Sequence, residues 1–172
     1  MMIRTWTKLV LVAAIFLFLS ACSTLEERAA KGMEKAEEVF FSESVEANEK
    51  IENVQFFKPS NFTLSEESDA QNIILTNRGE TFVLFVNPNE KTDSHLYYDL
   101  LKAQDEKILY EKTFEEKDRF GFVAVVQNAE NVMEVITSSG GIKMTTLAEE
   151  ENVDDHIETM MKVVNSVRIS KP

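Results

Sequence analysis

The stretch Val132–Leu147, VMEVITSSGGIKMTTL, decides the fold. Its two halves, 132–137 and 142–147, are rich in strand-forming residues, and the four residues between them, SSGG, are a turn signal. Two strands joined by so short a loop pair antiparallel. The sequence therefore predicts a β-hairpin here. Similar strand and turn signals occur in the region that precedes it.

More strands are predicted ahead of this hairpin. Residues 120–126 are apolar on both faces, which predicts a central strand. Residues 72–76 and 81–86 flank a second turn, in which Gly79 is expected to supply a positive φ angle. The other predicted strands are 54–57 and 107–114.

Two amphipathic helices accompany these strands. Ser94 is a candidate cap for the first helix, whose apolar side is Leu96, Tyr97, Leu100 and Leu101. The second helix runs from Asp154 to about Val167 and is expected to bury Ile157, Met160, Met161, Val164 and Val167. We predict the α+β class, with an antiparallel sheet of about six or seven strands and both helices covering one face.

The chain opens with the features of an export signal. Arg4 and Lys8 precede an uninterrupted apolar run, 9–19, which leads to the small residues Ser20 and Ala21. The run is too short to cross a bilayer, because a transmembrane helix takes about 20 apolar residues. We therefore predict that residues 1–21 are a signal peptide and that the rest of the chain is exported.

The segment Leu19–Cys22, LSAC, resembles the lipobox of bacterial lipoproteins. The resemblance implies that a diacylglycerol is attached to the Cys22 sulfur and that the chain is cut before this residue. Lipid chains can hold a protein stably, since each buried CH₂ contributes about 0.8 kcal/mol. The expected location is the outer face of the cytoplasmic membrane, or the outer membrane if the host has two membranes. The alternative is an ordinary secretory signal with a cysteine at the cut by chance.

Charge and cysteine content exclude several classes of function. The net charge of the chain is −12, and losing Arg4 and Lys8 with the signal peptide leaves −14. An acidic surface argues against a nucleic-acid partner and against electrostatic adhesion to anionic headgroups, which leaves the lipid as the expected membrane link. Cys22 is the only cysteine, so disulfides within the chain and thiolate metal sites are excluded.

The residues that follow the lipobox predict a helical segment. Residues 24–50 are rich in Glu, Lys and Ala, and Thr24–Glu27 fits a capping box. A thin apolar stripe has helical spacing; its members are Leu25, Ala29, Met33, Ala36 and Phe40. We interpret 22–50 as a lipid-anchored helical stalk, polar to about residue 35 and docked beyond it, and 51–172 as the globular domain.

Candidate catalytic and metal-binding residues are few. Asp93–His95 cannot form a catalytic triad among themselves, because consecutive side chains point in different directions. The acidic cluster 149–158 offers oxygen ligands for a hard cation but matches no EF-hand loop. We expect no catalytic residues and no cofactor. The weak metal candidates are Asp154, Asp155 and His156.

Three segments are similar to the Mog1/PsbP-like family, which includes small bacterial envelope lipoproteins. They are 57–62 (FKPSNF), 142–146 (IKMTT) and 164–169 (VNSVRI), within a region of about 54–170. The resemblance implies a binding or assembly accessory module without catalysis and names no site residue.

Three functions are therefore open for the exported domain. The first hypothesis is a noncatalytic binding or accessory module whose partner is an envelope protein or a small ligand. One alternative is a metal-dependent or other envelope hydrolase that uses the His and acidic cluster, and another is a structural or stress-linked lipoprotein.

Overall fold

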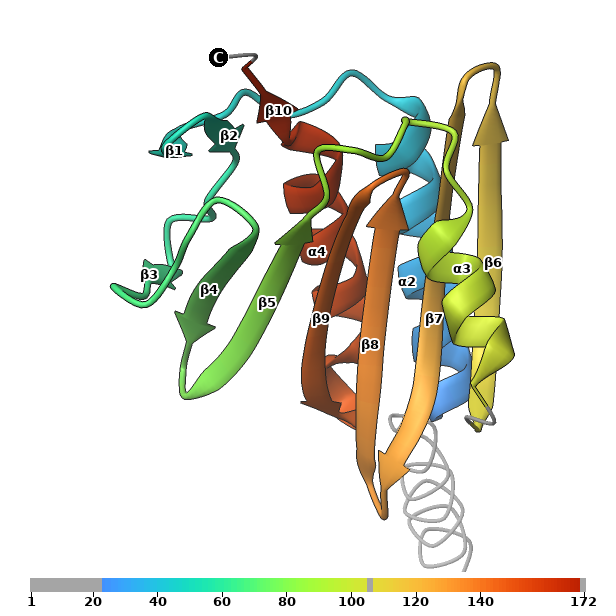
Figure 1. Cartoon of the computed structure of the whole chain (residues 1–172). Coiled ribbons are helices and arrows are strands. Elements are labelled where there is room, and N and C mark those ends of the chain that lie inside the picture. The colour runs from blue at the N-terminus through green and yellow to red at the C-terminus, as the bar shows by residue number, and fades with distance from the viewer. Residues whose placement is uncertain (1–22, 105–106, 171–172) are drawn as a thin grey trace, which may run out of the picture.

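A computed structural model describes residues 23–104 and 107–170, and it shows a seven-stranded antiparallel sheet flanked by helices (Figure 1). The sheet order is β3-β4-β5-β9-β8-β7-β6. Its strands are β3 (Thr63–Leu64), β4 (Asn72–Asn77), β5 (Glu80–Val86), β6 (Ile108–Glu116), β7 (Arg119–Ala129), β8 (Val132–Ser139) and β9 (Ile142–Glu149). A small second sheet joins β1 (Glu49–Ile51), β2 (Val54–Phe56) and β10 (Arg168–Ile169). The predicted α+β class is confirmed.

Both predicted hairpins are present. β8 and β9 pair from Ser139 and Ile142 outward, with Gly140 at φ 54° in the turn. The turn between β4 and β5 uses Gly79 at φ 89°, as predicted, and also places Arg78 at φ 49°. The strand expected to be central, now β7, lies between β6 and β8, while β9 occupies the middle of the sheet.

The helices lie on both faces of the sheet, not on one as predicted. They are α2 (Leu25–Phe41), α3 (Leu96–Ala103), the short 3-10 helix η1 (Glu150–Asn152) and α4 (Val153–Ser166). α2 and α4 lie side by side on one face, and α3 crosses the other (Figure 1). Under α3, a separate cluster buries Phe120, Phe122 and Ile136. This second covered face explains why β7 is apolar on both sides.

The N-terminal helix α2 is part of the core from its first turns. Ala29, Ala36 and Phe40 are fully buried, and Met33 nearly so, whereas the sequence predicted a polar stalk as far as residue 35. Small buried residues let α2 approach α4 closely. At Gly32 the approach is so close that an added Cβ would lie 2.9 Å from Ile157 Cδ1. Residues 25–36 therefore pack on the domain and do not extend from it as a stalk.

Side-chain hydrogen bonds pair with backbone groups at both ends of α2. The predicted capping box is confirmed: the Glu27 N–H donates to Thr24 Oγ1 and the Thr24 N–H to Glu27 Oε2, each at 3.2 Å. At the other end, Asn165 of α4 donates to the Val39 carbonyl and Arg119 of β7 to the Phe40 carbonyl, both at 2.9 Å. These contacts meet carbonyl groups that a helix end leaves unpaired.

Replacing Gly32 tests the close contact of the two helices. We expect Gly32→Val to lower the free energy of unfolding by about 1–3 kcal/mol, because the added methyl groups meet Ile157 and the Asp154 backbone. Ala30→Val on the exposed side of the same helix is the matched control and should cost at most about 0.7 kcal/mol of helix propensity. Urea denaturation of both variants measures the difference, and equal losses would contradict the close packing.

Candidate functional site

The seven-stranded sheet divides into a fork between β5 and β9. Their pairing ends at Phe82 and Thr146, whereas β9 stays paired with β8 as far as Glu149. At the end of the shared ladder, the Thr146 hydroxyl donates to the Thr81 carbonyl at 2.8 Å. Beyond this point the β4–β5 hairpin diverges from β9, toward the end of the molecule where α2 begins (Figure 1).

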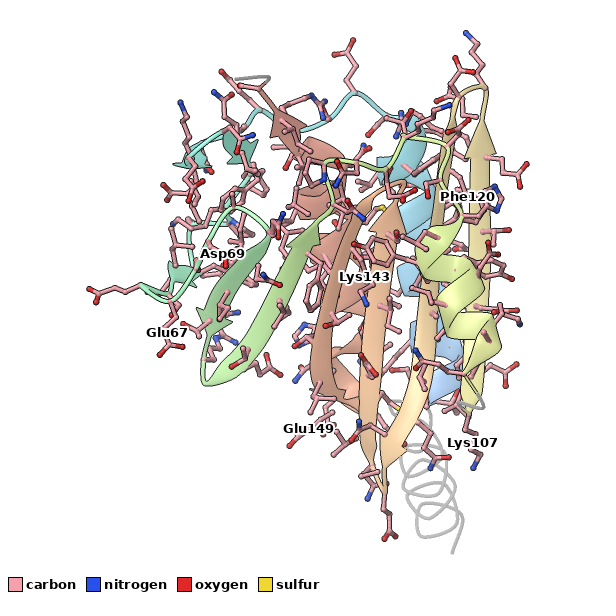
Figure 2. The ribbon with its side chains drawn as sticks, in the orientation of Figure 1. Glu67, Asp69, Lys107, Phe120, Lys143 and Glu149 are labelled. Atoms are coloured by element: carbon pink, nitrogen blue, oxygen red, sulfur yellow. The ribbon has the colours of Figure 1, made fainter. Side chains whose placement is uncertain are left out.

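A cleft of about 1020 Å³ occupies this fork, and we call it the fork cleft. Its walls come from β5, from the ends of β8 and β9, from the start of α4 and from residues 59–62. Leu147 of β9 is 52% exposed and gives the cleft an apolar surface, together with Val83 and Val132. Figure 2 shows Glu149 at the lower end of β9, where the cleft opens.

The lining of the fork cleft is strongly acidic. It holds five acidic side chains and one basic one, Arg78. The acidic residues are Glu80, Glu134, Glu149, Asp155 and Glu158. Hydrogen bonds from Lys162 and Lys35 lower the pKa of Glu158 and also offset its charge. Glu149 and Asp155, by contrast, are exposed at the cleft. The cleft therefore favours a cationic ligand.

His156 joins α4 to β5 inside the fork cleft. Its Nε2 lies 3.1 Å from Glu80 Oε2, which is an ion-pair distance, but the pair does not have the geometry of a hydrogen bond. The imidazole also meets the Phe82 ring edge to face, with centroids 5.1 Å apart. Its position between an acidic and an aromatic side chain is that of a residue that holds the cleft wall in place.

The three metal candidates do not converge. Asp154 points toward α2, where its Oδ2 accepts a hydrogen bond from Lys31 Nζ at 2.6 Å and Arg28 approaches to 3.5 Å. Asp155 and His156 line the fork cleft instead. Within residues 23–104 and 107–170, no group of three or more His, Cys, Asp or Glu side chains is placed to hold a metal ion.

The sequence Asp93–His95 forms no nucleophile and base pair. The Ser94 hydroxyl donates to Glu90 Oε2 at 2.5 Å and accepts from the Leu96 N–H at 3.2 Å. The His95 ring stacks on Phe120, with centroids 3.7 Å apart. His95, rather than Ser94, precedes the first residue of α3. Ser94 and His95 therefore have separate structural contacts.

The lipid attachment prediction falls on residues that the structure does not describe. Cys22 and the rest of the LSAC segment lie outside the described ranges. Within those ranges, no helix is both long and apolar enough to span a bilayer. The membrane link through Cys22 therefore stays a prediction.

The sequence did not predict the fork cleft. Leu147 ends a strand that the sequence predicted, and Glu80 lies in the turn predicted before the 81–86 strand, but neither residue was singled out. Neighbouring strands far apart in the chain are paired only by the tertiary fold, so their point of separation leaves no local signal.

The chain is similar to a solved structure of another protein. No family model matches the chain, and no curated protein matches it. The solution structure of cyanobacterial PsbP (CyanoP) from Synechocystis sp. PCC 6803 is similar, with a TM-score of 0.42 and 10% identity, over 69% of this chain and 87% of that chain.

Asp154 is expected to stabilise the fold in a pH-dependent way. Burial opposes its charge, but the Lys31 hydrogen bond and the charges of Lys31 and Arg28 outweigh it, so the pKa of Asp154 lies below the usual 3.8. A carboxylate with a lowered pKa stabilises the fold above its unfolded pKa and loses this effect as the pH falls through the folded value. At pH 7, Asp154→Asn should lower the free energy of unfolding by about 1–3 kcal/mol.

Urea denaturation at pH 7 and at about pH 3 checks this sign. The difference between the parent chain and Asp154→Asn should shrink at the lower pH, because the carboxyl group binds a proton more readily in the unfolded chain than in the folded one. Asp155→Asn is the matched control, since this neighbour is exposed, and it should change stability by no more than about 0.5 kcal/mol. An equal Asp154→Asn effect at both pH values would contradict the ion-pair role.

Proposed function

We propose that this chain is a noncatalytic accessory module that is tethered to the outer face of the cytoplasmic membrane through a lipid on Cys22 and binds a partner in the fork cleft. The observation that carries the binding role is the cleft itself. It combines an apolar surface at Leu147 with several polar groups, which is the mixed lining of a ligand site.

The geometry supports the hydrolase alternative less well. Ser94 is bonded to Glu90 rather than to an imidazole, and Asp154 is engaged by Lys31 and Arg28. A structural lipoprotein without a ligand would not need an acidic cleft at a fork in its sheet. The binding role is therefore the function that the geometry supports best.

The proposed tether would hold the domain close to the membrane. Only Ser23 and Thr24 separate Cys22 from Leu25, and an extended chain spans at most about 3.6 Å per residue, so α2 would begin roughly 10 Å from the lipid-bearing residue. The first turns of α2 are fixed to η1 and α4, since Arg28 Nη1 donates to the Glu151 carbonyl at 2.8 Å. The separation of β5 from β9 lies toward this same end of the molecule (Figure 1).

Replacing the proposed lipid-bearing residue tests the tether. We expect Cys22→Ser to remain unprocessed or to be released from membranes, because a hydroxyl group cannot take the place of the thiol in the thioether. Ser23→Ala leaves the LSAC segment intact and is the matched control. Fractionation of cells, with the size of each product read by immunoblot, gives the result, and a Cys22→Ser product of mature size held in the membrane would contradict the proposal.

A further inference from the structure

We propose that the fork cleft receives an extended, basic segment of a partner protein, which adds as a short strand along the free side of β9 at Leu147–Glu149. The inference names the ligand of the binding site proposed above. It rests on that binding role and not on the lipid tether.

The backbone of β9 supplies the first support for this ligand. Among the described residues, 147–149 of β9 pair with β8 on one side and have no strand partner on the side of β5. The unpaired side of a strand is a template for another extended chain, and peptide recognition domains use this mode of strand addition. The Thr146 hydroxyl, bonded to the Thr81 carbonyl, marks the residue at which the native pairing stops.

The side chains beside this edge supply the second support. An extended peptide alternates its side chains between two faces, so one set can meet the apolar surface at Leu147 while the other meets the acidic lining. Glu149 and Asp155 are exposed at the cleft, and both are negatively charged. Charge complementarity therefore selects Lys and Arg in the partner and disfavours Asp and Glu.

The outer edge of the sheet is a weaker candidate for strand addition. β6 is the last strand on its side, but its charged side chains are engaged by helices on both faces. Lys112 pairs with Glu37 of α2 at 2.7 Å, and Glu111 pairs with Lys102 of α3 at 2.9 Å. Charged residues along an edge strand oppose the addition of another strand. At the fork, residues 147–149 of β9 have an open side toward β5 that no described strand pairs with.

Three labelled peptides test the proposal on the full mature chain in a neutral detergent. The first is Lys-Val-Lys-Val-Lys-Val-Lys, the second replaces every Lys by Glu, and the third keeps every Lys but replaces every Val by Pro. Pro removes the backbone donors that a strand needs. By fluorescence polarisation, we expect the first peptide to bind at least about tenfold more tightly than the other two, and to bind more weakly at high salt because exposed charges are screened.

Two charge reversals localise the binding. Glu149→Lys should weaken binding of the first peptide about three- to fivefold, which corresponds to the loss of one exposed charge contact. Glu115→Lys, on the exposed side of β6, changes the net charge equally and should leave binding unchanged. Amide hydrogen exchange at residues 147–149 should also slow when the first peptide is bound to the parent chain. This measurement uses no variant, so it does not depend on whether a variant folds.

These measurements distinguish strand addition from nonspecific charge attraction, and they test it separately from the lipid tether. Equal binding of the Val and Pro peptides, equal effects of the two charge reversals, or unchanged exchange at 147–149 would each overturn the strand addition. These measurements do not depend on lipid attachment. A Cys22→Ser product of mature size held in the membrane would refute the tether alone, and absent peptide binding would refute the ligand assignment alone.

Discussion

The close packing of α2 on α4 is the contact on which the rest of the structure depends. Gly32 lets the helices approach until a Cβ would touch Ile157, and Asp154 is held from the α2 side by Lys31 and Arg28. The same α4 turn presents Asp155 and His156 to the fork cleft. The first turn of α4 therefore directs Asp154 toward α2 and directs Asp155 and His156 toward the cleft. The position of this cleft wall depends on the packing of α4 against α2.

The local elements could be predicted from the sequence because their signals are local. The SSGG turn and Gly79 each fix a hairpin through residues adjacent in the chain, and the apolar spacing of 157–164 fixes the last helix. The role of α2 could not be predicted in this way. Three of the five residues that it buries are Ala29, Gly32 and Ala36, which bury little apolar area but permit close helix contact, so the pattern resembles a weak, polar helix. The face taken by α3 also depends on tertiary packing rather than on its own periodicity.

The candidate site was less predictable than the fold. Asp154 and Asp155 are neighbours in sequence and share a residue type, yet one is buried in an ion pair and the other lines the cleft. Consecutive side chains of a helix point in different directions, so the orientation of α4 against α2 decides which of the two faces α2 and which faces the cleft. The fork depends on where β5 and β9 stop pairing, and these strands are joined through more than fifty intervening residues. Thr146 gives no sign in the sequence that its hydroxyl replaces a ladder bond at that point.

The proposed lipid on Cys22 would keep the end of the domain at which α2 begins near the bilayer. Lys117 and Glu130 lie in the turns at opposite ends of β7, which spans roughly 35 Å over its 11 residues. A dye on Glu130→Cys or on Lys117→Cys of the lipidated chain in vesicles can transfer energy to acceptor lipids. Transfer should be clearly more efficient from position 130, at the end where α2 begins, than from position 117. Equal transfer from both positions would show a domain that turns freely on its tether and would contradict the account.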